Sequence, residues 1–185
     1  MNYDTSLQTW KWRYLNNGYL GVSLIVDGKE LGLSSNYMLD KLWTKPKDGE
    51  NFSVQDARMY TAFEEGLRTI RMLSEDQIMQ LAINAVACQR FVLINPPASQ
   101  HFATCYKRHL IKTGDIVTVY TKMGTVGDCL VLEARDGENL SRLMLLNKVL
   151  YVKENKGFRL CDMIRINSDF VHPSRFVKQR NRLYA

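Results

Sequence analysis

Two histidines flank a cysteine at even spacing in the segment HFATCYKRH, which runs from His101 through Cys105 to His109. On a helix the two histidines would stand about 12 Å apart along the axis. On a strand each neighbouring pair would be about 13 Å apart. Because zinc needs its ligand atoms about 2.0 to 2.3 Å from one centre, the three side chains could share a metal only in a folded-back loop. The spacing favours a buried cysteine with partly exposed histidines, so we expect no metal site here.

Other catalytic signatures are missing from the sequence. It contains no GxxxxGK[ST] phosphate loop and no GxGxxG, HExxH or GxSxG motif. Cys105 and His101 could still act as nucleophile and base if the fold brought them together, but chance pairing is the simpler interpretation. Glu64 and Glu65 would point about 100° apart on a helix, whereas Glu64 and Arg68 can pair on its surface. We therefore predict that the chain is not an enzyme and has no cofactor.

The composition is that of a globular protein with a basic surface. The chain has 185 residues, of which 45% are hydrophobic, and a net charge of +6 with a pI near 9.2. This excess of basic over acidic side chains favours acidic partners. No segment of signal-peptide or membrane-span character is present, so we expect an intracellular protein without membrane insertion. Four cysteines without a CxxC pair are then expected to be reduced.

The first half of the sequence indicates a small antiparallel sheet followed by two helices. Alternating segments bounded by turn-forming residues predict strands over 9–15, 19–26 and 30–33. Ser53 with Asp56, and Ser74 with Gln77, have the spacing of capping boxes. Apolar residues at helical spacing predict one helix over about 54–72 and a second after Ser74.

Two tryptophans, Trp10 and Trp12, lie two residues apart in the first predicted strand. Both side chains must therefore point to the same face of that strand. They either form the core of the first domain or an exposed apolar ridge, and the core interpretation is favoured.

The second half has the pattern of a β domain. The segment NPPASQ, residues 95–100, cannot continue a helix because proline lacks the amide hydrogen. Short strand-like segments then alternate with glycine, aspartate and asparagine turns. We therefore predict an α+β fold, with an N-terminal α/β domain in which two helices pack on a small antiparallel sheet, followed by a C-terminal twisted β-sheet or barrel-like domain. The predicted boundaries are 1–95, 96–172 and a basic tail at 173–185.

The sequence resembles the ZapC family of cell division proteins, the Z-ring-associated proteins. The resemblance rests on the motif Trp10-Lys11-Trp12-Arg13-Tyr14, on MLDKL at residues 38–42, and on the helical block from Phe52 to Phe91. His101-Phe102 then follows a proline-containing connector, as in the family pattern. Leu93 and Ala98 stand where the family pattern has lysines.

The resemblance implies a cytoplasmic, non-enzymatic protein of the mid-cell division ring. It implies that the chain binds FtsZ, the tubulin-like GTPase, promotes lateral association of its filaments and reduces GTP turnover. Such a protein would act as a monomer or weak dimer. Bridging two filaments requires either two contact surfaces on one molecule or a dimer.

For the contact with FtsZ we expect a cleft around the connector. Arg90 would meet partner carboxylates, and Phe91 or Phe102 would anchor in the centre of the interface unless both are core residues. The full set of FtsZ-binding candidates is Glu64, Arg68, Arg90, Phe91, Asn95, Pro97, Ser99, His101 and Phe102.

The C-terminal tail is the second candidate, acting by electrostatic attraction that salt would screen. Its cationic residues are Arg175, Lys178, Arg180 and Arg182.

A nucleic-acid-binding role for the C-terminal β domain is the alternative function. Tyr106-Lys107-Arg108 and Tyr120-Thr121-Lys122 mix aromatic and basic side chains, as single-strand binders do. Because the positive charges are dispersed outside the tail, no nucleic-acid partner is expected.

Overall fold

The structure is a computed structural model that describes residues 7–26, 28–106, 110–134 and 139–176. Its two α-helices are α1 (Val54–Leu67) and α2 (Glu75–Phe91). The strands are β1 (Lys11–Tyr14), β2 (Tyr19–Val26), β3 (Lys29–Met38), β4 (Ile116–Tyr120), β5 (Val126–Ala134), β6 (Leu140–Leu145), β7 (Val149–Lys153), β8 (Lys156–Arg159), β9 (Met163–Asn167) and β10 (His172–Pro173). The predicted α+β class is confirmed.

The N-terminal sheet is a three-stranded antiparallel meander in the order β1-β2-β3. Its register places Trp12 opposite Val22 and Val22 opposite Leu33, so these side chains share one face. Trp10 and Trp12 are 4% and 0% exposed, which confirms the core interpretation of the tryptophan pair. β3 is longer than the predicted segment 30–33, because α2 supports its second half.

Both predicted capping boxes are present. The Ser53 side chain accepts from the backbone N–H of Asp56, and Ser74 accepts from that of Gln77. Each box satisfies backbone donors that the first helical turn leaves free. α1 ends at Leu67, short of the predicted residue 72, because tight turns follow it.

The C-terminal strands form an open sheet and a separate hairpin. The sheet has the order β10-β4-β5-β6-β9, and β7 pairs only with β8 among the described residues. The larger sheet is buried on both faces. Leu130 and Leu132 of β5 face the helices, whereas Cys129 and Val131 join a second hydrophobic cluster on the opposite side. This two-sided burial explains why β5 is almost continuously apolar.

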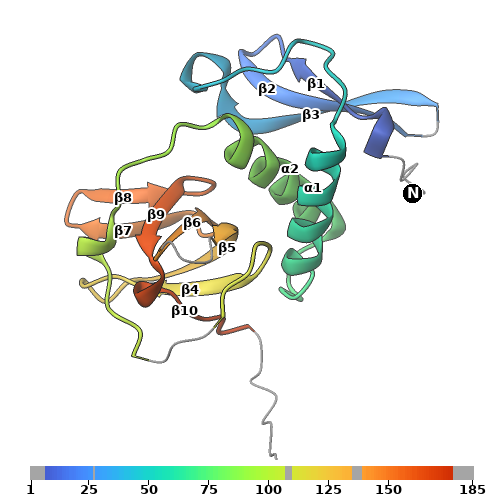
Figure 1. Cartoon of the computed structure of the whole chain (residues 1–185). Coiled ribbons are helices and arrows are strands. Elements are labelled where there is room, and N and C mark those ends of the chain that lie inside the picture. The colour runs from blue at the N-terminus through green and yellow to red at the C-terminus, as the bar shows by residue number, and fades with distance from the viewer. Residues whose placement is uncertain (1–6, 27, 107–109, 135–138, 177–185) are drawn as a thin grey trace, which may run out of the picture.

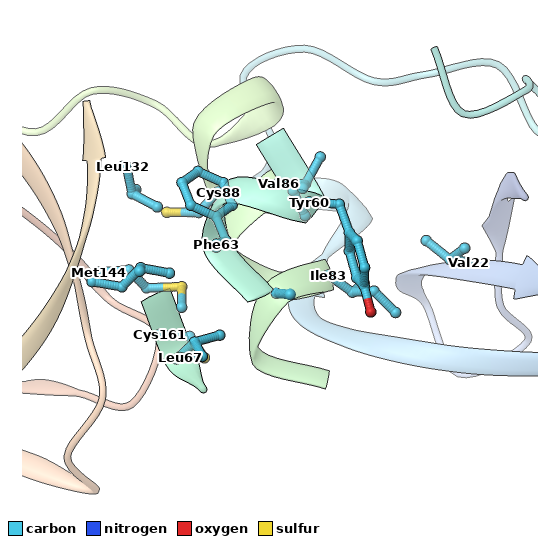
Figure 2. Close-up of a cluster of buried hydrophobic side chains, with 14 of the residues drawn as sticks. Val22, Tyr60, Phe63, Leu67, Ile83, Val86, Cys88, Leu132, Met144 and Cys161 are labelled. Carbon is cyan, nitrogen blue, oxygen red and sulfur yellow. The ribbon is translucent and has the colours of Figure 1, made fainter. Parts of the chain in front are cut away.

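The helices lie between the two sheets (Figure 1). One hydrophobic cluster runs from Val22 of the N-terminal sheet through Phe63 and Cys88 of the helices to Leu132 and Met144 of the C-terminal sheet (Figure 2). The domain boundary at residue 95 stays a prediction, since this cluster contains residues from both sides of it.

Candidate binding surface

Arg90, the expected contact for partner carboxylates, forms an ion pair with Asp56 of α1. The Asp56 side chain is 1% exposed and also accepts hydrogen bonds from Ser53 N (2.9 Å) and Trp12 Nε1 (3.3 Å). The Arg90 guanidinium lies 5.0 Å from the centre of the Phe91 ring. Arg90 therefore links the end of α2 to the start of α1, and its charge is compensated within the protein.

Phe91 and Phe102 lie in two different hydrophobic clusters. Phe91 is 3% exposed and makes an edge-to-face contact with Trp12, with ring centres 5.0 Å apart. Phe102 is fully buried and stacks on Phe158 at 6.4 Å. Either ring would have to leave its hydrophobic cluster to anchor in a partner. Both phenylalanines are therefore core residues in this structure.

The connector covers the outer edge of β9. Ala98 N donates to Arg165 O at 2.8 Å, and the Ser99 hydroxyl accepts from Asn167 N at 2.8 Å. Asn95 Nδ2 donates to the Met163 carbonyl at 3.2 Å. Among the expected connector contacts, Asn95 and Ser99 thus hold the connector to the sheet, while the ring of Pro97 is exposed.

Glu64 and Arg68 form the predicted ion pair, at 3.1 Å. Arg68 also reaches Glu75 at the start of α2, at 2.6 Å. The hydrogen bond that Arg68 donates to Glu75 is the main cause that raises the pKa of Arg68. This exposed cluster bridges the two helices across their connecting turn.

The expected electrostatic tail lies mostly outside the described residues, which end at Phe176, so Lys178, Arg180 and Arg182 have no structural description. Arg175 is described and forms an ion pair with Asp128 on β5, where its Nε donates to Asp128 Oδ1 at 2.8 Å. Asp128 is 3% exposed. The start of the basic segment is therefore attached to the C-terminal sheet.

No group of three or more His, Cys, Asp or Glu side chains could hold a metal ion in the part of the chain that the structure describes, which excludes His109. Cys88, Cys129 and Cys161 are buried free thiols. Burial raises the pKa of both the Cys88 and the Cys161 thiol to about 12, so these groups are protonated at neutral pH. A protonated, buried thiol is a poor nucleophile.

Exposed basic and apolar side chains gather at the β7–β8 hairpin. Along β7 the exposed residues Val149, Tyr151 and Lys153 alternate with the buried residues Leu150 and Val152. The buried pair fixes the hairpin to the second hydrophobic cluster. The exposed set is therefore held on a rigid element.

The hairpin faces the turn between β4 and β5 across a surface hollow of about 520 Å³. Thr125 Oγ1 donates to the Tyr151 carbonyl at 2.6 Å and holds the two elements together. Tyr151 and Met123 line the hollow and are 51% and 53% exposed. Lys153 and Glu154 also line it.

His101 is the member of the connector set that lies beside this hollow. The backbone N–H of Lys122 donates to the His101 carbonyl at 2.9 Å. Desolvation lowers the pKa of His101, and the charges of Lys153, Lys156 and Lys122 lower it further. His101 is therefore neutral at pH 7, and the positive charge around the hollow comes from lysines. We define the hairpin surface as His101, Lys122, Met123, Tyr151, Lys153 and Lys156.

Sequence reasoning found His101 and Lys122 but missed the rest of the hairpin surface. Lys153 pairs with Lys156, so the turn of the hairpin falls at residues 154–155. The alternation of exposed and buried residues from 149 to 153 was the signal that could have identified a one-sided hairpin.

Rigid hairpins that present an aromatic side chain among lysines are suited to binding acidic macromolecules. Among the described residues, no helix is both long and apolar enough to cross a membrane. The surface and the fold together define a candidate binding protein of the α+β class.

Comparison with known proteins identifies the family. Residues 5–93 match the family model described as Cell-division protein ZapC, N-terminal. The chain is 33% identical to the cell division protein ZapC of Xenorhabdus bovienii, over 67% of this chain and 68% of that protein. It is 28% identical to that of Shewanella woodyi, over 89% of this chain and 88% of the relative. For Ferrimonas balearica the identity is 26%, over 99% of both chains. The chain therefore belongs to the ZapC family of cell division proteins.

Proposed function

We propose that this chain binds filaments of FtsZ, the tubulin-like GTPase of the division ring, at mid-cell in the cytoplasm. In this proposal it promotes lateral association of the filaments and slows GTP turnover. Membership of a cell division family supports the role in division. The hairpin surface is the observation that supports the contact with an acidic polymer.

The chemistry of the hairpin surface suits such a partner. Lys122, Lys153 and Lys156 are exposed, and Glu154 is the one acidic side chain among the residues that line the hollow. Tyr151 offers a rigid, amphipathic ring of the kind that is enriched in binding sites. Lysines at the rim would increase the association rate with an acidic surface, and the ring would supply buried contact area.

Lateral association follows from charge and valency. Acidic filaments repel each other side by side, and a chain with net charge +6 reduces that repulsion when it binds. A reduction of charge repulsion does not by itself join two filaments, because joining them needs two points of attachment. A chain with one contact surface only coats a single filament. His101, which belongs to the hairpin surface, is the member of the expected connector site that we retain in this interface.

Co-sedimentation with purified FtsZ and GTP tests the proposal. The full chain should pellet with polymer, increase bundled filaments in electron micrographs and lower the rate of phosphate release. A matched sample with GDP, in which FtsZ does not polymerise, controls for aggregation. Recovery of the chain in the supernatant, with unchanged phosphate release, would contradict the proposal.

Single-stranded nucleic acid is the second candidate partner, because Tyr151 between lysines could stack on a base while lysines contact phosphates. Fluorescence anisotropy with a labelled oligonucleotide separates the two functions. The FtsZ proposal predicts only weak binding that disappears as salt rises. Submicromolar binding that persists at moderate salt would favour the nucleic-acid function.

A further inference from the structure

A row of charged side chains crosses the C-terminal sheet next to the apolar row that packs against the helices. The members of the apolar row, which pair across β5, β6 and β9, are Leu130, Met144 and Met163. Arg142 and Arg165 each lie two residues away from a member of that row, so their side chains point to the same face. Arg142 also pairs with Glu133 of β5. We call Glu133, Arg142 and Arg165 the charged row.

The two arginines of the charged row lie directly opposite each other on β6 and β9. The carbonyl of Arg165 accepts a hydrogen bond from Ala98 N at 2.8 Å, on the outer edge of β9. A residue whose backbone groups point outward forms a non-hydrogen-bonded pair with its cross-strand neighbour, in which the Cα atoms are about 4.5 Å apart and the side chains approach most closely. The side chains of Arg142 and Arg165 therefore start from adjacent points on one face.

The charges of the two arginines are compensated unequally. Arg142 Nη2 forms an ion pair with Glu133 Oε2, and these side chains are 14% and 22% exposed. Arg165 is half-buried, and within the described part of the chain its guanidinium has no hydrogen bond, ion pair or ring contact. Like charges directly opposite each other destabilise a sheet, and a half-buried guanidinium loses part of its hydration. The positive charge of Arg165 is thus not compensated by any described residue.

The charged row lies where α2 meets the C-terminal sheet. Cys88 of α2 belongs to the same hydrophobic cluster as Met144 (Figure 2) and is close enough to Arg142 for their charges to interact. Desolvation is the main cause that lowers the pKa of Arg142, and the charge of Arg165 lowers it further. Electrostatic attraction is stronger in such a partly desolvated place than in water. An anion bound here would relieve the repulsion between the two arginines.

We propose that Arg142 and Arg165 form a binding site for a phosphoryl group, either as free phosphate or as the phosphate of a larger molecule. A phosphoryl group has three strong acceptor oxygens, so it can accept from two guanidiniums at once. A carboxylate has two oxygens, which one bidentate arginine satisfies. Arg165 supplies the bidentate contact, and Arg142, which Glu133 orients, supplies the second. Glu133 lies at the far end of the row from Arg165, where its repulsion of the ligand is weakest.

This site is separate from the hairpin surface. The charged row is on the face of the sheet that packs against the helices, whereas Leu150 and Val152 hold the β7–β8 hairpin to the hydrophobic cluster on the opposite face. The proposal therefore does not depend on binding to FtsZ and can be tested on the free protein.

Titration with inorganic phosphate, followed by NMR, tests the site. Sodium phosphate replaces sodium chloride at pH 7 and constant ionic strength, while the Nε–Hε signals of the arginine side chains are observed. The signals of Arg142 and Arg165 should shift until they saturate, whereas the signal of Arg159, an exposed arginine of β8, should not. Small shifts of equal size at all arginines, without saturation, would contradict the proposal.

Substitution of Arg165 measures its contribution. Arg165→Gln should weaken phosphate binding at least about tenfold, because the bidentate contact is lost. Arg165→Lys keeps the charge without the planar fork and should bind with intermediate affinity. The matched control, Arg159→Gln, removes one positive charge from an exposed position and should bind phosphate as the unaltered chain does. Equal affinities of Arg165→Gln and Arg159→Gln would overturn the proposal.

Thermal unfolding separates a loss of binding from a loss of folding. Without phosphate, Arg165→Gln should be at least as stable as the unaltered chain, because the repulsion of Arg142 is removed. Phosphate should raise the melting temperature of the unaltered chain, relative to chloride at the same ionic strength, but not that of Arg165→Gln. An equal rise in both proteins would show that phosphate acts elsewhere. A marked loss of stability of Arg165→Gln without phosphate would show that Arg165 is a structural residue and would also reject the site.

Two further ligands define the chemical class. Acetate should bind at least about tenfold more weakly than inorganic phosphate, because it has too few oxygens to join both guanidiniums. Equal binding of acetate would overturn the assignment to a phosphoryl group. Adenosine monophosphate distinguishes the two sources of phosphate. Binding at least as tight as that of inorganic phosphate supports the phosphate of a larger molecule, whereas binding of inorganic phosphate alone supports the free ion.

Discussion

Gly66 of α1 and Gly114 of the loop before β4 are in direct backbone contact. A Cβ on Gly66 would lie 1.7 Å from the Gly114 carbonyl oxygen, and a Cβ on Gly114 would lie 2.6 Å from the Ala62 carbonyl oxygen. Gly114 also has a φ of +89°, which favours glycine. The close approach seats the C-terminal sheet directly on the first helix.

Gly66→Ala should destabilise the protein by about 1 to 3 kcal/mol, because the added methyl group must displace the backbone of the loop. Urea unfolding measures the effect. Helix propensity alone would make Gly66→Ala stabilising, because alanine is more favourable in a helix than glycine. A decrease in the free energy of unfolding therefore reports the close contact with Gly114. Gly32→Ala is the control, since that position has open space around it. A stabilised Gly66→Ala variant would show that the contact is not tight.

Arg90→Ala should lower the free energy of unfolding by about 3 kcal/mol, because it leaves the buried carboxylate of Asp56 without its cation. Arg58→Ala, which removes an exposed arginine from the same helix pair, should change it by less than about 0.5 kcal/mol. Chemical denaturation of both variants checks the difference. A loss of FtsZ binding by Arg90→Ala without a loss of stability would instead support the direct contact role expected from the sequence.

His101 should make the protein less stable below about pH 6.5, the usual pKa of an unfolded histidine. Burial and three neighbouring lysines lower the pKa of His101 in the folded state. Between the two pKa values the unfolded chain binds the extra proton, so stability falls as pH falls and levels off below the folded pKa.

The His101→Asn variant should lack this part of the pH dependence. As the pH is lowered from 7.5 to 5, the urea midpoint of the unaltered chain should therefore fall relative to that of His101→Asn. Parallel curves would contradict a lowered pKa. Direct titration of the His101 ring signals by NMR provides an independent value.

Local patterns predicted much of the fold. Ser53 and Ser74 start the helices as their capping boxes indicate, and Trp12 lies in the core as its spacing from Trp10 suggested. These features depend on residues close together in the sequence, where geometry is fixed by the backbone.

The candidate sites were harder to predict because they depend on long-range contacts. The ion pair between Arg90 and Asp56 joins residues 34 positions apart. Spacing gave no sign that the connector would cover β9. The hairpin surface depends on the pairing of β7 with β8, which brings Lys153 opposite Lys156.

Charge reversal on the hairpin surface tests the central claim most directly. Lys153→Glu combined with Lys156→Glu should weaken co-sedimentation with FtsZ polymer at least about tenfold, or about 1.4 kcal/mol. The control, Arg58→Glu combined with Arg71→Glu, makes the same change in net charge at exposed positions near the helices. If this control retains binding while the hairpin variant loses it, the hairpin surface is the contact. Equal binding by both double variants and the unaltered chain would contradict it.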